Sequence, residues 1–434
     1  MDTPICDFVG RYAESGMLRL HMPGHKGMGP LGCEQWDITE VKGADSLYEA
    51  EGIIAESEKN ASALFGCPTF YSTEGSSQCI RAMLHLAALH AKRQGKSPHI
   101  AAGRNAHKAF LSAVALLHVD VTWLYGSQQE SYLSCTVTAD DVDSLEGDVT
   151  ALYLTSPDYL GNMADIAAVA EACHEKGILL LVDNAHGAYL RFLQPSLHPM
   201  DLGADLCCDS AHKTLPVLTG GAYLHIRDAQ LACQAKKSLA LFGSTSPSYL
   251  ILQSLDSANR YLSCGYGEKL ERFVQAVADC KTRLQTVGNE PMKLTIPAKI
   301  YGYTGTELAE LLRQRGMECE FADPDYFVLM PTPEMGTEIL RKLEEALAQI
   351  PKRTPIMTDP PQAVRPEQVY SIRRALLSPG RNVPVEESLG HVLADPSVGC
   401  PPAVPILICG ERIDANAIAS FRYYGIKSCT VVDE

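Results

Sequence analysis

The sequence predicts an α/β protein with a mainly parallel sheet, on the strength of three observations. Short apolar runs recur between residues 69 and 226, and amphipathic helical patterns separate several of them. The run 178–182 is apolar throughout and ends in Asp183, which is typical of a strand buried on both faces. Strands and helices that alternate in this way form a mainly parallel sheet with helices on both faces.

The first 45 residues look irregular, and we expect them to form an N-terminal arm. Their centre is His-Met-Pro-Gly-His-Lys-Gly at 21–27. Two histidines four residues apart would suit a metal site on a helix, but Pro23 and Gly24 disfavour a helix there. A turn that packs against another surface is therefore the favoured interpretation, and no metal site is predicted.

Residues 46–264 are expected to form the larger domain. Apolar residues recur at helical spacing from Ile53 to Phe65, and Gly66 is placed to end that helix. Further helices are expected at 78–92 and 166–176. The seven expected strands lie near residues 69–73, 99–102, 121–124, 151–155, 178–183, 206–209 and 222–226.

Residues 265–434 are expected to form a smaller C-terminal α/β domain. Thr304 and Glu307 are spaced as a capping box that opens a helix at 307–314, and residues 326–330 are typical of a strand. A connector rich in proline covers 351–366 and leads to the final segment.

Composition narrows the class of protein. The chain of 434 residues carries a net charge of −15, which disfavours nucleic acid as a partner and is compatible with a cationic substrate. Its 15 cysteines include no Cys-x-x-Cys pair, as expected of reduced thiols in the cytoplasm. Neither a signal peptide nor an apolar stretch that could span a membrane is apparent.

Asp183 and Lys213 stand just past the ends of two expected strands. Ligands of open α/β sheets bind at that carboxyl edge. A lysine and a carboxylate so placed suit pyridoxal phosphate: the lysine forms a Schiff base with the cofactor aldehyde, and the aspartate keeps the pyridine nitrogen protonated. Each residue taken alone has a commoner explanation, with Asp183 as a helix cap and Lys213 as a solvated loop residue.

Other motifs could bind an anion or a flat ring. Gly75-Ser76-Ser77 lies between a strand and a helix, where free backbone amides bind phosphate, although serine is also a common helix cap. His107 could lie on a cofactor ring or be an ordinary capping or buried histidine. Ser210 and His212 flank Lys213 closely enough to reach a phosphate or move a proton. The segment 243–247 opens another helix, as an anion site or a plain cap.

Taken together, these motifs resemble the bacterial ornithine/lysine/arginine decarboxylases, of the aspartate aminotransferase fold type, over nearly the whole chain. The short form, without an additional N-terminal domain, is the one that the sequence resembles. The matching motifs are Pro-Gly-His-Lys from Pro23, Gly-Ser-Ser from Gly75, Asn-x-His-Lys from Asn105, Ser-Pro from Ser156, Asp-x-Ala-His-Gly from Asp183, Ser-x-His-Lys-Thr-Leu-Pro from Ser210, Ser-Thr-Ser-Pro-Ser-Tyr from Ser244, Pro-Pro-x-x-Pro from Pro401 and Gly-Glu-Arg-Ile from Gly410.

The resemblance implies a fold like that of the pyridoxal phosphate-dependent transferases and a set of site residues. Lys213 would be the Schiff-base lysine, Asp183 would pair with the pyridine nitrogen, and His107 would stack on the ring. The residues implied to bind the cofactor also include Gly75, Ser76, Ser77, Ala185, His186, Ser210 and His212, with Ser244 or Thr245 supplied by the other subunit of a homodimer. The active site would therefore lie at the dimer interface.

Four positions depart from the family pattern. Asn184 stands where glutamate is common, Asp158 where threonine is usual, and Ala403 where glycine is usual, while Glu74 precedes Gly-Ser-Ser. None of them removes the lysine or the aspartate. Glu74 and Asp158 add negative charge near the expected site, so the substrate stays open.

The sequence thus predicts pyridoxal phosphate-dependent decarboxylation of arginine, lysine or ornithine, with Lys213, Asp183, His107 and His212 as catalytic residues. Glu386 or Glu387 could hold the distal cationic group of the substrate, or could simply form a solvated acidic turn. Two alternatives stay open: an aminotransferase or lyase of the same fold, and a catalytically silent regulatory relative.

Overall fold

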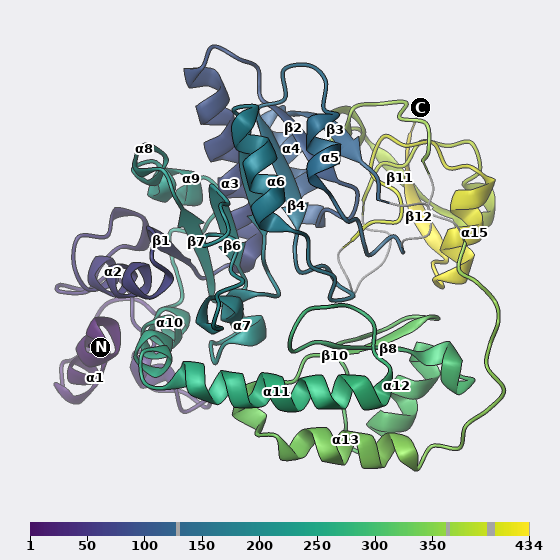
Figure 1. The fold of residues 1–434 in the computed structure, drawn as a ribbon. Helices are drawn as coiled ribbons and strands as arrows, with labels where there is room; N and C mark the ends of the chain where they lie inside the picture. Colours follow the sequence, from purple (N-terminus) through teal and green to yellow (C-terminus); the bar gives the residue numbers. More distant parts are fainter. Residues whose placement is uncertain (127–130, 362–364, 397–403, 434) are drawn as a thin grey trace.

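A computed structural model describes the chain except for residues 127–130, 362–364, 397–403 and 434. The described residues form a central seven-stranded sheet in the order β1-β7-β6-β5-β4-β2-β3 (Figure 1). Its strands are β1 (Thr69–Ser72), β2 (His99–Gly103), β3 (Asp120–Leu124), β4 (Ala151–Thr155), β5 (Leu179–Asp183), β6 (Leu206–Asp209) and β7 (Ala222–Ile226). Among these strands β7 alone runs opposite to the other six, so the predicted fold class, with its mainly parallel sheet, is confirmed.

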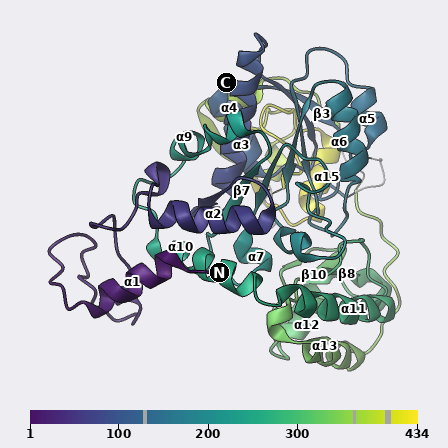
Figure 2. The ribbon, with the colours of Figure 1, turned by 60° about the vertical axis from the view of Figure 1, so that its left-hand side comes forward.

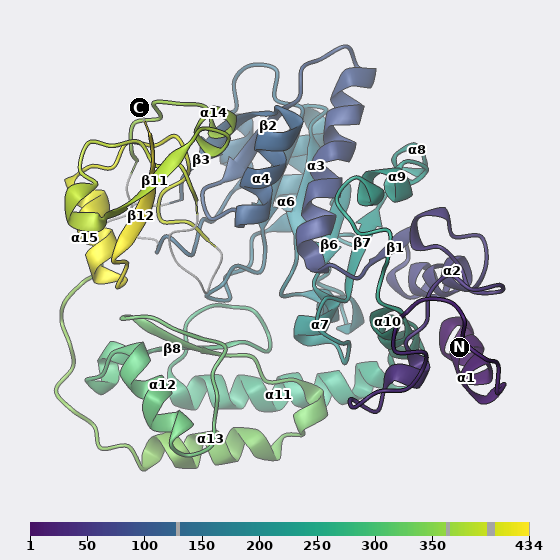
Figure 3. The same ribbon diagram turned by 180° about the vertical axis from the view of Figure 1, so that it is seen from behind.

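Helices cover both faces of this sheet, as Figures 1 and 3 show from opposite sides. One face carries α3 (Gly75–Arg93) and α4 (Lys108–Leu117), and the other carries α5 (Ala139–Asp143) and α6 (Ile166–Glu175). In β5, Leu181 packs into the first of these layers, whereas Leu180 and Val182 pack into the second. This two-sided burial explains why the strand is apolar throughout.

The sequence suggests an irregular N-terminal arm, but part of the arm is helical. Residues Pro4–Glu14 form helix α1, which packs against α2 (Ile53–Phe65) and α10 (Tyr249–Leu262). The carboxylate of Asp256, in α10, accepts hydrogen bonds from the backbone N–H groups of Ile5 and Cys6 at 3.0 Å. The helix is thus capped by a side chain about 250 residues away, a contact that local sequence patterns do not reveal.

The motif at 21–27 forms turns, as expected. Its two histidines do not converge on a common ligand position: His21 Nε2 lies 2.5 Å from the hydroxyl of Tyr12, and His25 Nε2 lies 3.1 Å from the carboxylate of Asp37. The arm projects beside α1 and α2 at one side of the molecule (Figure 2).

The smaller α/β unit begins with α11 (Tyr266–Leu284) and lies below the central sheet in Figure 1. Its described strands pair in the order β8-β10-β9. The predicted capping box is confirmed, because Thr304 and Glu307 cap each other's backbone N–H groups at the start of α12. The elements of this unit are β8 (Leu294–Pro297), α12 (Gly305–Arg313), β9 (Phe321–Ala322), β10 (Tyr326–Leu329) and α13 (Glu338–Ala348).

The C-terminal segment returns to the larger domain. In its described part, β11 (Gly380–Pro384) pairs with β12 (Ser428–Val432), and α15 (Ala415–Tyr423) packs with them around a separate apolar cluster. An ion pair joins this segment to the turn that follows β2. The guanidinium of Arg104 lies 2.8 Å from the carboxylate of Glu411, whose side chain is buried. The division into residues 1–45, 46–264 and 265–434 stays a prediction, and the last of these ranges holds two separate sheets.

The remaining helices are α7 (Ala211–Thr214), α8 (Ala229–Ala232), α9 (Ala235–Ala240) and α14 (Ile372–Leu376). No helix in the described residues is both long and apolar enough to cross a bilayer.

A buried carboxylate ties the centre of the sheet together. Asp209, at the end of β6, accepts hydrogen bonds from His198 Nε2 at 3.1 Å and His225 Nε2 at 3.0 Å, and its other oxygen accepts one from the amide of Asn184 at 2.7 Å. All four side chains are fully or almost fully buried. Despite burial, the two histidines hold the pKa of Asp209 well below its ordinary value.

We expect Asp209→Asn to lower the free energy of unfolding by about 3 kcal/mol near neutral pH, because an amide nitrogen would face the amide of Asn184. Since the folded-state pKa of Asp209 is depressed, its stabilisation is present above the ordinary aspartate pKa of about 3.9 and is lost as the pH falls below it. The gap between variant and native protein in urea unfolding should therefore narrow in acid.

Asp201→Asn is the matched control, since the ion pair of Asp201 with Arg191 is partly exposed and should contribute at most about 1 kcal/mol. An equal loss in both variants would contradict the role given to Asp209.

Candidate active site

The carboxyl edge of the sheet brings the two central predicted residues together. Asp183 ends β5, and β6 lies beside it in parallel and leads through Ser210 into α7, which carries Lys213. The charge of Lys213 acts on Asp183, so the two groups are electrostatic neighbours. The arrangement is the one that the sequence predicts for a ligand site of an open α/β sheet.

Asp183 is an almost completely buried carboxylate with defined partners. One oxygen accepts a hydrogen bond from the hydroxyl of Tyr153 at 2.9 Å, and the other accepts one from the backbone N–H of Ala185 at 3.2 Å. Burial raises its pKa above the ordinary value, while the nearby Lys213 acts in the opposite direction. A cationic ring N–H is therefore a group that Asp183 is suited to pair with.

Lys213 projects into the same region. Its Nζ lies 2.9 Å from Nε2 of His186, in the loop after β5. Burial lowers the pKa of Lys213, and the charges of Asp183 and Glu320 oppose that effect. Lowering the pKa of a lysine extends the range over which its amine is uncharged and nucleophilic.

The start of α3 fits a phosphate group. Ser210 Oγ donates a hydrogen bond to Ser76 Oγ at 2.7 Å, so a hydroxyl from the turn after β6 meets one from the first turn of α3. A helix N-terminus of this kind favours an anion. Gly75 has φ of +73°, a conformation that favours glycine, and a Cβ built there would meet no atom within 4 Å. The space beside Gly75 is thus open, and Ser77 follows on the same turn of α3.

His107 is the N-cap of α4, which is one of the two roles that the sequence allows for it. It also lies near Lys213, whose charge acts on it. Its Nδ1 accepts a hydrogen bond from the backbone N–H of Ala109 at 3.1 Å. Burial, with Lys213 and Lys108 nearby, lowers the pKa of His107 to about 3. The ring is neutral and flat, which suits packing against another ring.

His212 is fixed by the backbone rather than by a partner side chain. Its Nδ1 lies 3.0 Å from the carbonyl oxygen of Gly221 and donates to it. Burial lowers its pKa, whereas the carbonyl of Gly221 acts in the opposite direction. Its Nε2 is therefore the acceptor of the ring.

Ser244 and Thr245 are exposed and do not begin a helix. The cap of α10 is Ser248, whose Oγ accepts from the backbone N–H of Ile251, so the helix starts later than the sequence suggested. The backbone N–H of Ser244 donates to the carboxylate of Glu74, which places this loop beside the start of α3 in the same chain. Supply of Ser244 or Thr245 by a second subunit stays a prediction.

Two of the departures from the family pattern have structural partners. Asp158 is buried and accepts hydrogen bonds from the backbone and side chain of Asn162, at 2.8 Å each, within one turn. Asn184 holds Asp209, as described above. Ala403 and the motif from Pro401 fall outside the described residues, apart from Val404 and Pro405.

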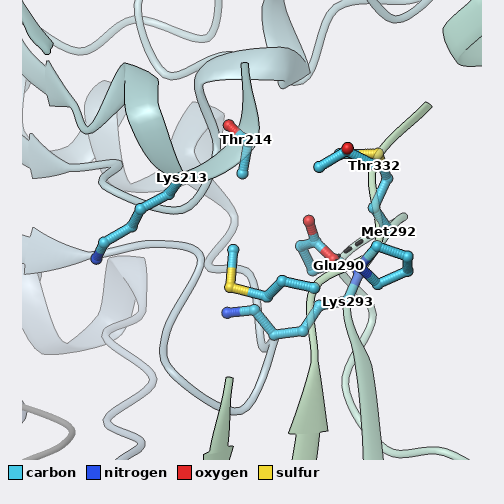
Figure 4. A pocket seen from close by; sticks show the side chains of 8 residues that line it. Lys213, Thr214, Glu290, Met292, Lys293 and Thr332 are labelled. Carbon is cyan, nitrogen blue, oxygen red and sulfur yellow. Dashed lines mark hydrogen bonds between the residues drawn. The ribbon is translucent and has the colours of Figure 1, made fainter. Parts of the chain in front are cut away.

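The sequence did not reveal three residues that border the site. Lys293 and Glu290 precede β8, and with Lys213 they line one pocket (Figure 4). The exposed Glu320 acts electrostatically on Lys213, His212 and Lys293 and accepts a hydrogen bond from the hydroxyl of Tyr159 at 3.1 Å. These residues approach only through folding, and no local pattern marks them.

Glu386, by contrast, is exposed and lies 3.5 Å from Arg422. Its neighbour Glu387 is exposed in the same short turn. Their assignment to the distal group of a substrate stays a prediction.

His198, Cys207 and Asp209 also offer ligand atoms within 4.8 Å of one another. Asp209 is already bonded to two histidines and an amide, and His198 Nδ1 accepts from the backbone N–H of Met200 at 3.3 Å. The carboxylate and the imidazole thus have protein partners, and a structural cross-link explains them.

The comparisons with known proteins identify a family that this chain matches. The family model of the major domain of Orn/Lys/Arg decarboxylases matches residues 3–331. The chain belongs to this family. The matched range extends past residue 264, the predicted end of the larger domain.

Relatives of this family member extend over nearly the whole chain. An arginine decarboxylase of Halalkalibacterium halodurans is 28% identical, over 97% of this chain and 93% of that protein. An arginine decarboxylase of Bacillus subtilis is 27% identical, over 96% and 92%.

Solved structures confirm the fold. The lysine decarboxylase LdcF of Francisella novicida has a TM-score of 0.78 at 15% identity and covers 99% of this chain and 81% of its own. The constitutive lysine decarboxylase of E. coli has a TM-score of 0.75 at 16% identity and covers 100% and 82%.

We expect Lys213 to react with small aldehydes at lower pH than an exposed lysine does. Because burial lowers its pKa, its uncharged amine persists further into the neutral range. Reductive methylation with formaldehyde across a pH series, read by peptide mass spectrometry, gives the midpoint for each lysine. The exposed Lys237 is the internal reference, and a midpoint for Lys213 at or above that of Lys237 would be inconsistent with the lowered pKa.

Proposed function

We propose that this protein catalyses the pyridoxal phosphate-dependent decarboxylation of a basic amino acid, namely arginine, lysine or ornithine. The observation that carries the proposal is the meeting of Lys213 and Asp183 at the carboxyl edge of the sheet, beside the hydroxyl pair of Ser76 and Ser210. Membership of the Orn/Lys/Arg decarboxylase family and the names of the arginine decarboxylase relatives support it.

Each group of the cofactor has a counterpart in the chain. The start of α3 with Ser76 and Ser210 would hold the phosphate, His107 would pack on the ring, and Asp183 would hold the proton of the ring nitrogen. Lys213 would provide the amine for the aldehyde. The bound cofactor supplies an electron-withdrawing ring that stabilises the negative charge left at Cα when CO₂ departs. Lys213 Nζ or a neighbouring histidine then returns a proton to Cα.

The substrate side chain of all three candidate amino acids ends in a cation. Glu320 is an exposed carboxylate whose charge reaches Lys213, and it is positioned by the hydroxyl of Tyr159. It is therefore better placed in this chain than Glu386, which pairs with Arg422 at the surface. We assign Glu320 to the distal cationic group.

A homodimer with the active site near the interface completes the proposal. The arm after α1 leaves a cluster of large apolar side chains largely in solvent, with Leu18, Leu20 and Leu31 78–84% exposed in the single chain. Exposed apolar clusters of this kind mark surfaces that associate. The cysteines of the described residues are free thiols, which supports a cytoplasmic location.

The first test is CO₂ release from arginine, lysine and ornithine by the purified protein with added pyridoxal phosphate. Release from one of them is expected, and Lys213→Ala should lower turnover by at least about 10³-fold, because the proton-transfer group and the cofactor anchor are lost together. Lys237→Ala should leave it unchanged. A keto acid as product would favour an aminotransferase, and a protein that binds no cofactor would favour a silent relative.

We expect Glu320→Gln to raise the KM for the basic amino acid about tenfold with a smaller change in kcat, since a hydrogen bond between charged groups contributes roughly 1.5–3 kcal/mol. Steady-state kinetics on the preferred substrate give both constants. Glu318→Gln is the matched control, because Glu318 is exposed two residues earlier and pairs with Arg313. An unchanged KM in Glu320→Gln would remove Glu320 from the substrate site.

A further inference from the structure

His186 lies between the amines of the half-buried Lys213 and the buried Lys293. Its Nε2 is 2.9 Å from Nζ of Lys213, and its Nδ1 is 2.8 Å from Nζ of Lys293. Lys213 belongs to the larger domain, whereas Lys293 precedes β8 of the smaller unit, and both line the pocket in Figure 4. Both ring nitrogens of one histidine are thus engaged by lysine amines.

The hydrogen bonds allow only certain charge states. Burial, together with the two lysines, pushes the pKa of His186 well below its ordinary value, so the ring is neutral. A neutral imidazole has one N–H that donates and one nitrogen that accepts, whereas an ammonium can only donate. One lysine must therefore be a neutral amine that accepts from His186, and the other donates to it, as an amine or as an ammonium.

The surroundings place the positive charge on Lys293. Its Nζ also donates to the carbonyl oxygens of Asp158 at 2.9 Å and Tyr159 at 3.4 Å, so with His186 Nδ1 it has three acceptors for the three hydrogens of an ammonium. It lies 5.7 Å from the centre of the Tyr159 ring, a further contact that favours a cation.

Nearby carboxylates support the same assignment. Burial lowers the pKa of Lys293 to about 8, while Glu290 and Asp158 act in the opposite direction, and the ammonium stays the main form at neutral pH. Lys213 Nζ, by contrast, has a single hydrogen-bond partner among the described residues, the Nε2 of His186. An ammonium at this half-buried position would leave two of its hydrogens without a protein acceptor among the described residues, which is unfavourable.

We propose that Lys293 is a positioning residue that keeps Lys213 uncharged through His186. The ammonium of Lys293 donates to Nδ1, which fixes the proton of His186 on Nε2, and that N–H donates to the lone pair of Lys213. The free amine is the form that can bind a cofactor aldehyde, so the inference gives the proposed function a residue from the smaller domain and rests on Lys213 as the nucleophile.

The same cluster contains other groups that titrate or carry charge. Those that act on His186 or Lys293 are Lys213, Glu290, Asp158, Glu320, His107 and His212. The carboxylates among these groups act on Lys293, so a pH titration would report the combined protonation of the whole cluster. The position of the proton on His186 therefore has to be measured directly.

The direct measurement is the tautomer of His186 in the cofactor-free native protein near neutral pH. Imidazole nitrogens with and without a proton have well-separated ¹⁵N chemical shifts, and comparison with His186→Gln in histidine-labelled protein assigns the signal. We expect a neutral ring with its proton on Nε2. A proton on Nδ1, or on both nitrogens, would overturn the proposal without any variant of Lys293.

The second measurement is a double-mutant cycle on the methylation midpoint of Lys213. Lys293→Met should raise that midpoint by about one pH unit, a tenfold loss of free amine, because His186 can then turn its acceptor nitrogen toward an ammonium. In a His186→Phe background the same change should alter the free-amine fraction by less than about twofold. Equal shifts in both backgrounds would indicate direct charge repulsion and would overturn the relay.

Controls separate this result from folding defects and from the proposed function. Lys281→Met removes another half-buried lysine, which donates to the backbone carbonyl of Glu290 but is not recorded as a partner of His186, and should leave the midpoint of Lys213 unchanged. Lys293→Arg keeps the charge and should restore part of the native midpoint. Both measurements use cofactor-free protein without substrate, so their outcomes are independent of whether the protein releases CO₂.

Discussion

The buried carboxylate of Asp209 is the interaction on which the rest of the larger domain depends. It holds His225 of β7, His198 of the preceding loop and Asn184 at the end of β5 to the last residue of β6. A buried charge with several hydrogen-bond donors has few alternative arrangements, because any displacement leaves the charge or a donor without a partner. The next residue along the chain is Ser210, and Lys213 follows one helical turn later. The hydrogen bonds of Asp209 therefore fix the position from which the chain continues to Ser210 and Lys213.

Exclusion of water is the common cause of the electrostatics at the site. It raises the pKa of Asp183 and lowers the pKa values of Lys213, His107 and His186. All four shifts favour the uncharged form, yet each group has a neighbour that either opposes or reinforces the change. The shifts thus favour neutral histidine rings and a neutral lysine amine beside the carboxyl group of Asp183.

The strands of the larger domain could be predicted to within about a residue because burial on both faces leaves an apolar run that needs no knowledge of the partner. The motifs also located Asp183, Lys213 and the hydroxyls at the start of α3. What the sequence could not reveal depends on distant contacts. Helix α1 is capped by Asp256, and Lys293 and Glu320 reach Lys213 only once the smaller unit has packed against the sheet. The start of α10 was misplaced because several serines compete there as caps, and Ser248 is the one with the capping bond.

The origin of Lys293 in the smaller unit has a consequence for how such chains can be recombined. A fragment that ends before α11 would retain the residues assigned to the phosphate, the ring and the aldehyde, but would lack Lys293, the amine that we propose fixes the proton on His186. The reactivity of the nucleophile would then vary with whichever C-terminal unit were joined to it. Chimeras between relatives should accordingly take the stretch from Glu290 to Lys293 and the loop that carries His186 from the same parent protein.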